Sequence, residues 1–235
     1  KFKQIDLRLE KCASLYYATE EELEDAQGLS EVLLQAFAEE ITFTVEDAIF
    51  RGDGAGKPLG ILAHASQVSV AKETSQAANS LVIENILKMW SRLPARSKLQ
   101  AVWNVNVDTE PQLYLLKHTV KNVAGTENVG GFAAPIYTPP VAGGFGSLMG
   151  RPVIPIEYAE TIGTKGDITL NDWTQYQLIE KGMRSDASMH VRFLNDEQTF
   201  RLVYRVNGQP KWSKALTPFK GSATLSPFVT LDTRA

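Results

Sequence analysis

A single long amphipathic stretch limits what this chain can fold into more than any other feature of the sequence. Apolar residues recur in it at spacings of three and four: Leu34, Phe37, Ile41, Val45 and Ala48. This periodicity predicts one buried face of a helix. With a start at Thr19 and an end at Gly52, the helix, or two helices in line if Gly28 interrupts it, extends for about thirty residues, roughly 45 Å. An element of this length in a chain of 235 residues suits a flat molecule.

The beginning of this stretch carries a helix start signal. Thr19 is followed three residues later by Glu22, which predicts a capping box. Carboxylates crowd the first turns: Glu20, Glu21, Glu22, Glu24 and Asp25. The positive end of the helix dipole stabilises negative charge at this position. This explanation is favoured over a metal site, because consecutive carboxylates on a helix point apart.

The rest of the chain mixes helical and extended patterns. Ile5, Leu7 and Leu9 alternate with charged residues, which predicts an extended arm over 1–15. We expect a helix over 81–93, a short helix capped by Asp108 or Thr109, a surface loop over 125–150, and strands over 101–107, 151–156, 168–179, 190–205 and 227–231. Asn207-Gly208 predicts a hairpin turn. Because the order lacks a βαβ rhythm, the predicted fold class is α+β.

Composition excludes several classes of protein. The 24 basic and 27 acidic residues nearly balance, which argues against a protein that works by neutralising phosphates. A shell around nucleic acid stays possible, because a closed container holds its contents by confinement. The single cysteine, Cys12, excludes an intramolecular disulfide and favours a reducing cytoplasm. No apolar run approaches the ~18 residues of a membrane span, and no signal peptide is recognised.

Several motifs follow one another in a fixed order. Residues 50–62 read FRGDGAGKPLGIL, residues 149–153 read MGRPV, and Gly166-Asp167 is followed by Asp172 and Tyr176. Further motifs lie within 11–25, 103–106 and 193–208. Together these motifs resemble the major capsid proteins of tailed phages, the family with the Hong Kong 97 fold. The residues that carry the family signature are Gly52, Asp53, Gly54, Gly56, Pro58, Gly60, Gly150, Pro152, Gly166 and Asp167.

The resemblance implies a particular layout of the chain. Residues 1–17 would be the returning strand of an extended N-terminal arm, and 18–57 would be a peripheral domain with a long spine helix. Residues 58–185 would form an axial domain, and 186–235 would return to the peripheral domain. In this family an upstream arm strand and a cleaved or scaffold-like segment precede the arm, so we expect both before Lys1.

The resemblance also implies a function. The chain would be a structural protein that assembles into pentamers and hexamers of an icosahedral head, enclosing double-stranded DNA without sequence-specific binding. Expected partners are further copies of itself, a portal, a maturation protease and a scaffold segment, with no membrane. The protein would be made in the bacterial host cytoplasm and end in the virion. Two alternatives remain: an encapsulin-like compartment shell, and an uncharacterised soluble hydrolase.

The glycines of the 50–62 motif also have a physical interpretation. Glycine adopts positive φ without strain, so we expect positive φ in at least one of Gly52, Gly54 and Gly56. Pro58 would then fix an extended exit from the turn. A phosphate loop is disfavoured, because Lys57 is followed by Pro58 where a hydroxyl residue is required.

No catalytic, cofactor-binding or metal-ligating residue is predicted, and no cofactor. Cys12 could pair with one of the scattered histidines, His64, His118 and His190, but none of these lies beside a carboxylate motif. The tryptophans are expected to pack in the core or in interfaces: Trp90, Trp103, Trp173 and Trp212.

Overall fold

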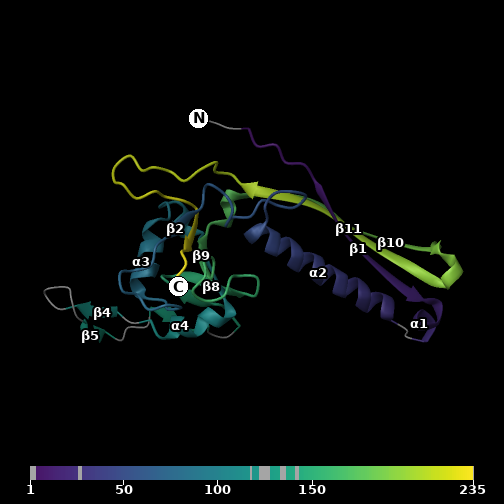
Figure 1. Cartoon of the computed structure of the whole chain (residues 1–235), viewed down its shortest axis with the longest axis horizontal. Helices are drawn as coiled ribbons and strands as arrows, with labels where there is room; N and C mark the ends of the chain where they lie inside the picture. Colours follow the sequence, from purple (N-terminus) through teal and green to yellow (C-terminus); the bar gives the residue numbers. More distant parts are fainter. Residues whose placement is uncertain are drawn as a thin grey trace. The chain divides into compact units, whose positions relative to one another are not determined.

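The chain forms two compact units, and each is built from segments far apart in the sequence. The computed structural model describes residues 4–25, 28–116, 118–121, 128–132, 136–140 and 143–234. Unit 1 comprises Lys1–Ala63 and Gln177–Lys211, and unit 2 comprises His64–Tyr176 and Trp212–Ala235. Figure 1 follows the chain through both units.

Unit 1 combines a sheet of long strands with the long helix. The sheet has three strands in the order β1-β11-β10: β1 is Glu10–Thr19, β11 is Glu197–Pro210 and β10 is Tyr176–Arg192. β1 and β11 are antiparallel, in register from Glu10↔Val206 to Thr19↔Glu197. The short 3-10 turn η4, Phe193–Asn195, separates β10 from β11. The helices are α1, Glu20–Asp25, and α2, Leu29–Arg51.

Gly28 explains why the predicted long helix is two helices. Its φ is 99°, a left-handed conformation that interrupts the helical hydrogen bonds at low cost only for glycine. Beyond it, α2 buries Ile41, Ala48 and Phe50, and β11 buries Leu202. The helix packs on β1 and β11, as Figure 1 shows. The predicted apolar face is therefore the face that packs on the sheet of unit 1.

The predicted capping box is confirmed at the start of α1. The Thr19 N–H donates to Glu22 Oε2, and the Glu22 N–H donates to Thr19 Oγ1, both at 3.3 Å. Each side chain thus satisfies a backbone N–H that lacks a helical partner.

Thr19→Ala removes half of this box. We expect it to lower the free energy of unfolding by about 1 kcal/mol, because the first turn loses an acceptor. Thr44→Ala, at an exposed position inside α2, is the matched control and should be neutral or slightly stabilising, because alanine has the higher helix propensity. Urea unfolding of both variants is the measurement. Equal midpoints for Thr19→Ala and the wild type would contradict the prediction.

Unit 2 is organised around one mixed sheet. Its seven strands have the order β2-β12-β9-β3-β8-β7-β6. Their bounds are Val68–Val70 (β2), Phe228–Leu231 (β12), Ile168–Asn171 (β9), Val102–Asn106 (β3), Arg151–Ile156 (β8), Gly146–Leu148 (β7) and Tyr137–Thr138 (β6). β12 is parallel to β2 and β3 is parallel to β8, and the other neighbours are antiparallel. A separate pair consists of β4, His118–Lys121, and β5, Asn128–Phe132.

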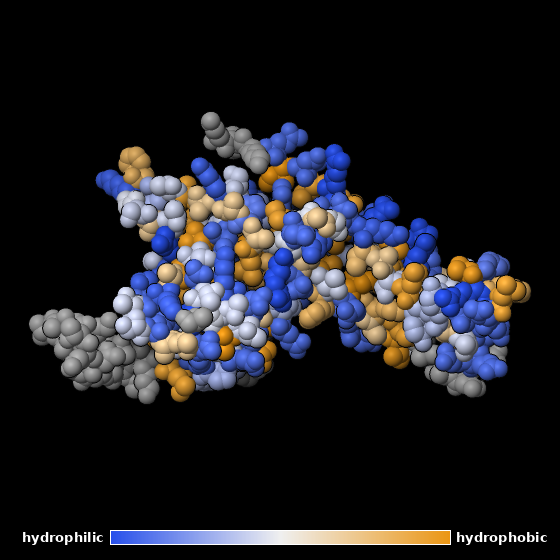
Figure 2. Space-filling model, viewed as in Figure 1, coloured by the Kyte–Doolittle hydropathy of each residue, from blue (hydrophilic) through white to orange (hydrophobic). Residues whose placement is uncertain are grey.

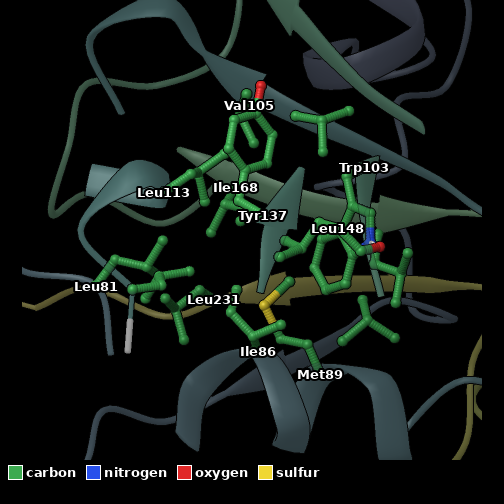
Figure 3. Close-up of a cluster of buried hydrophobic side chains, with 14 of the residues drawn as sticks. Leu81, Ile86, Met89, Trp103, Val105, Leu113, Tyr137, Leu148, Ile168 and Leu231 are labelled. Atoms are coloured by element: carbon green, nitrogen blue, oxygen red, sulfur yellow. Dashed lines mark hydrogen bonds between the residues drawn. The ribbon is translucent and has the colours of Figure 1, made fainter. Parts of the chain in front are cut away.

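Two helices and three 3-10 turns complete unit 2: α3, Ile83–Ser91; α4, Glu110–Tyr114; η1, Ser97–Leu99; η2, Val107–Thr109; and η3, Trp173–Gln175. The core lies between α3 and the sheet, and Figure 3 shows Ile86 and Met89 of α3 pointing toward it. Trp103 of β3 is fully buried there, and its indole N–H donates to the Leu148 carbonyl at 3.0 Å. The expectation that Trp103 packs in the core is confirmed.

Three predicted features differ from the structure: the start of the arm strand, the loop over 125–150 and the cap of a short helix. The arm strand begins at Glu10, and Ile5 and Leu9 remain 37% and 39% exposed, because pairing with β11 starts only at Glu10. The expected surface loop over 125–150 contains β5, β6 and β7. Thr109 occupies the predicted N-cap position of α4, Glu110–Tyr114, but its side chain makes no capping hydrogen bond. Asn106 caps the preceding 3-10 turn, where its side chain accepts from the Asp108 N–H at 2.9 Å.

The predicted hairpin turn at Asn207-Gly208 is wrong. Both residues lie inside β11, where the Asn207 side chain donates to the Arg8 carbonyl and the Gly208 carbonyl accepts from the Leu59 N–H. These contacts hold the dipeptide extended, and the chain reverses at η4 and Asp196, whose φ is 57°. Tertiary hydrogen bonds have overridden the local turn preference.

Candidate functional site: a signature turn and a buried ion pair

The FRGDGAGKPLGIL motif folds back onto the end of α2. The Gly60 N–H donates to the Gly52 carbonyl at 2.8 Å, and the Ile61 N–H donates to the Ile49 carbonyl at 3.0 Å. The last carbonyls of a helix have no partners within it. This turn supplies some of the missing donors, so the signature sequence closes the C-terminus of the long helix.

Two signature glycines are required because backbones approach closely. A Cβ on Gly60 would lie 2.6 Å from the Gly52 nitrogen and from the Phe50 carbonyl oxygen. A Cβ on Gly52 would collide with the carbonyl of Pro58. Gly52 itself has φ −57°, so its backbone conformation is open to other residues and only the lack of space demands glycine.

The other two glycines of the turn are required for their conformation. Gly54 has φ 79° and Gly56 has φ 70°, which confirms the expected positive φ within the turn. Nothing lies within 4 Å of a Cβ built on Gly56. At that position the cost of another residue comes from backbone strain alone.

Asp53 organises the inside of the turn. Its carboxylate accepts from the Ala55 N–H at 3.1 Å and lies 3.6 Å from Lys57 Nζ. The Ala55 N–H, followed by the charge of Lys57, holds the pKa of Asp53 below its usual value. An acidic group in this position disfavours phosphate, in agreement with the missing hydroxyl residue after Lys57.

Asp53→Asn tests this arrangement through its pH dependence. Because the folded-state pKa of Asp53 is lowered, its stabilising effect is present above the unfolded pKa of about 3.9 and is lost as pH falls through the folded value. We therefore expect the melting temperatures of wild type and variant to differ at pH 6 and to converge below about pH 4. A difference that stays constant over this whole range would contradict the role given to the carboxylate.

The second signature motif is a tight hairpin turn. Met149 and Gly150 have φ 53° and 72°, and they join β7 to β8 between Leu148 and Arg151, which are paired. Two central residues with positive φ define the turn type that matches the twist of adjacent strands. Pro152 follows in β8, opposite Ser147 of β7.

The third signature motif ends in a fully buried ion pair. The side chains of Asp167 and Arg234 have no exposed surface, and the guanidinium donates to both carboxylate oxygens. The carboxylate also accepts from the N–H groups of Gly163, at 3.0 Å, and Ile168, at 2.8 Å. Burial raises the pKa of Asp167, while Arg234 and these N–H groups act in the opposite direction. Gly166, with φ 103°, brings the chain into this site.

Arg234 links three distant segments around this carboxylate. Its Nε donates to the Ser80 carbonyl at 2.7 Å, its backbone N–H donates to the Gly163 carbonyl at 2.7 Å, and its carbonyl accepts from Asn79 at 3.0 Å. Sequence analysis singled out Asp167 and missed Arg234. The only available signal was an arginine shortly after a buried strand, and such a pattern does not reveal which carboxylate it meets.

The candidate chemical sites are not assembled in the part of the chain that the structure describes. Within it, no three His, Cys, Asp or Glu side chains group as metal ligands, and no helix is long and apolar enough to cross a membrane. Cys12 lies on β1 and His190 on β10, and β11 separates these strands. His64 Nδ1 contacts Ser66 Oγ at 2.8 Å, and the side chain of His118 lies outside the described residues.

The architecture of the chain is shared with solved capsid and encapsulin structures. The structure is similar to the capsid of an empty GTA particle, with a TM-score of 0.68 and 19% identity over 97% of this chain and 74% of that chain. It is similar to a chain from Mycobacterium phage Bobi, with a TM-score of 0.62 and 12% identity over 95% and 71%. It is also similar to the holo-SrpI encapsulin complex from Synechococcus elongatus PCC 7942, with a TM-score of 0.57 and 11% identity over 95% and 73%.

No curated protein matches the sequence. The model of the phage capsid family matches residues 1–221, and the chain belongs to this family. The predicted resemblance and the mixed helix-and-strand, Hong Kong 97-like fold are thereby confirmed. Membership of this family makes the chain a structural capsid protein rather than an enzyme.

Proposed function

We propose that this chain is the subunit of a tailed-phage head shell. Copies assemble into pentamers and hexamers of an icosahedral shell, which encloses double-stranded DNA without sequence-specific contacts. The match of the phage capsid family over residues 1–221 carries this proposal. The near balance of 24 basic and 27 acidic residues agrees with confinement of the DNA rather than tight binding.

The two units provide the domains that such a subunit needs. Unit 1, with α2 as the spine helix, takes the role of the peripheral domain, and unit 2 takes the role of the axial domain. The proposed boundaries after residues 57 and 185 lie near the changes of unit at 63 and 176, and the boundary after residue 17 separates the arm within unit 1. The third change of unit, after Lys211, places residues 212–235 in unit 2, because β12 pairs with β2 and β9. The signature residues hold these units in shape and take part in no chemistry.

The remaining partners follow from the same proposal. A portal, a maturation protease and a scaffold segment act with the subunit during assembly in the bacterial host cytoplasm, and the finished protein resides in the virion. An encapsulin-like compartment is the second candidate, favoured by the similarity to the SrpI encapsulin complex. The match of the phage capsid family model over residues 1–221 supports the phage assignment.

Expression of the complete gene in bacteria tests the proposal. We expect closed particles by negative-stain microscopy, sedimenting far ahead of single subunits. Particles produced with the portal, protease and DNA-packaging genes of the same source should contain DNA that resists nuclease. Particles that enclose a specific protein and no DNA would favour the encapsulin-like alternative. A chain that stays monomeric under all these conditions would contradict the proposal.

A further inference from the structure

The sheet of unit 1 has one side covered by α2 and one side that carries a cluster of positive charge. Side chains from all three strands line a hollow of about 330 Å³ on the open side, and the charged ones are Lys11, Lys181, Arg184, Asp186, Arg201 and Arg205. Five of these six are cations. We call this group the cationic face. The covered side of β1 is lined by the alternate, more buried residues of the strand.

Two of these cations oppose one another directly. Lys11 of β1 is paired in register with Arg205 of β11, and both side chains are exposed. Like charges directly opposite across two strands destabilise a sheet. The single carboxylate, Asp186, contacts Arg184 at 3.0 Å and Arg201 at 2.8 Å. The face thus retains an excess of positive charge that an anionic partner would relieve.

The long helix of the same unit carries the opposite charge along one flank. Glu31, Gln35, Glu39, Thr42 and Glu46 follow at spacings of four, four, three and four, which places them in one row on the helix surface. Gln35, Glu39, Thr42 and Glu46 line a shallow hollow of about 380 Å³, together with Ala38 and Phe43. We call this row the acidic flank. No lysine or arginine occurs between residues 29 and 50.

The two surfaces both include exposed apolar side chains. Phe43 is 44% exposed beside the acidic flank, and Figure 2 shows hydrophobic atoms among hydrophilic ones over the helix. Leu15 and Tyr17, on the same side of β1 as Lys11, are 55% and 39% exposed.

This mixture indicates a protein partner rather than nucleic acid. Arginine and aromatic residues are enriched where proteins meet, whereas contacts to phosphates need charge and hydrogen-bond donors but no exposed leucine. The chain as a whole has no basic excess, and the two surfaces of unit 1 carry charge of opposite sign. A second copy of this chain carries the complementary surface.

We propose that the cationic face of one copy binds the acidic flank of α2 from a neighbouring copy. The inference rests on the proposed function, because it requires many copies in contact. Two different surfaces that meet head to tail can close into a ring when the rotation between copies allows it. Complementary charge then speeds encounter and fixes the register of the contact.

Zero-length crosslinking tests the contact directly. Chains with natural and heavy isotopes are mixed, assembled and treated with a carbodiimide, which joins a lysine amine to a touching carboxylate. We expect amide bonds between a light and a heavy chain, from Lys11 or Lys181 to Glu39 or Glu46. Crosslinks only within one chain, or between other residues, would overturn the inference.

A charge exchange provides the second test. Lys11→Glu with Arg205→Glu cancels the net positive charge of the cationic face, and Glu39→Lys with Glu46→Lys reverses the charge of the acidic flank. We expect each double variant to lower the yield of assembled particles at least about tenfold, because the first loses the attraction and the second replaces it with repulsion. The fourfold variant restores the attraction with the partners exchanged, so its yield should return to within about threefold of the wild type.

Two controls separate docking from folding and from net charge. Lys214→Glu with Lys220→Glu makes the same change in net charge as Lys11→Glu with Arg205→Glu, but on exposed residues of unit 2, and should leave the yield unchanged. Lys11→Glu alone should leave the melting temperature of the subunit unchanged or higher, because it replaces a repulsion with an attraction to Arg205. The same single variant should still weaken assembly.

The outcomes distinguish this inference from the proposed function. Normal particles from every variant would overturn the inference and leave the proposed function standing. Crosslinks at the expected residues in small oligomers, without closed particles, would support the contact and count against the proposed function. Normal assembly of the Lys11→Glu, Arg205→Glu variant, with loss of DNA from its particles, would overturn the inference in favour of phosphate binding.

Discussion

Replacement of Arg234 by methionine should lower the free energy of unfolding by about 3–5 kcal/mol, because it leaves the Asp167 carboxylate buried without its partner. Methionine fills part of the vacated space, so the loss reflects the unpaired charge more than a cavity. For a chain of this size the change corresponds to a fall in melting temperature of roughly 10 °C. Calorimetry and guanidinium unfolding are the measurements.

The pH dependence of this variant separates charge from packing. Without the guanidinium, the folded-state pKa of Asp167 rises further above its unfolded value of about 3.9. A group with a raised folded pKa loses stability as pH increases through that value, so the variant should be less destabilised near pH 4.5 than at pH 8. Arg234→Lys, which keeps a cation, should show a smaller loss. An equal deficit at both pH values would refute the buried-charge explanation.

The second large effect is expected at Gly60. Gly60→Ala should lower the free energy of unfolding by about 3 kcal/mol, because the new Cβ would lie 2.6 Å from backbone atoms at the end of α2. Backbone atoms in a closed turn cannot move aside as a flexible side chain can. Denaturant unfolding gives the magnitude, and amide hydrogen exchange should locate the loss at the Gly60 and Ile61 hydrogen bonds.

Alanine substitutions at two other glycines serve as controls for this result. Gly56→Ala, at positive φ with open space around it, should cost about 1 kcal/mol through strain alone. Gly182→Ala, with open space and no positive φ, should be close to neutral. If Gly60→Ala were no worse than Gly56→Ala, the close approach of the two backbone segments would not be what requires glycine at position 60.

Sequence reasoning succeeded where the determinants are local. The interruption at Gly28, the capping box of Thr19 and Glu22, and the strands predicted over 151–156 and 227–231 all follow from neighbours within a few residues. It also selected the glycines of the signature turn. It attributed them to conformation alone, and could not separate Gly54 and Gly56 from Gly52 and Gly60, because close approach depends on where another segment passes.

Sequence reasoning failed where an element depends on residues that are far away in the sequence. The start of β1 is set by Val206, nearly two hundred residues later, and the partner of Asp167 is Arg234. Asn207-Gly208 is a strong turn signal that the Leu59 N–H and the Arg8 carbonyl override. Such pairings leave no periodicity in the sequence, so neither pattern nor composition can reveal them.

The order in which the strands join the two sheets bears on how the protein is synthesised. β11 lies between β1 and β10, and β12, which begins at Phe228, lies between β2 and β9. A nascent chain therefore cannot close either sheet until translation has passed these late strands, on the order of 10 to 50 s after Lys1 is added. Strands such as β1 and β2 therefore remain unpaired until the late strands have been synthesised. Such pairing between segments distant in sequence is slow to form. Chains that have not yet added these strands thus lack finished surfaces, so only subunits translated past β12 can compete for places in a growing particle.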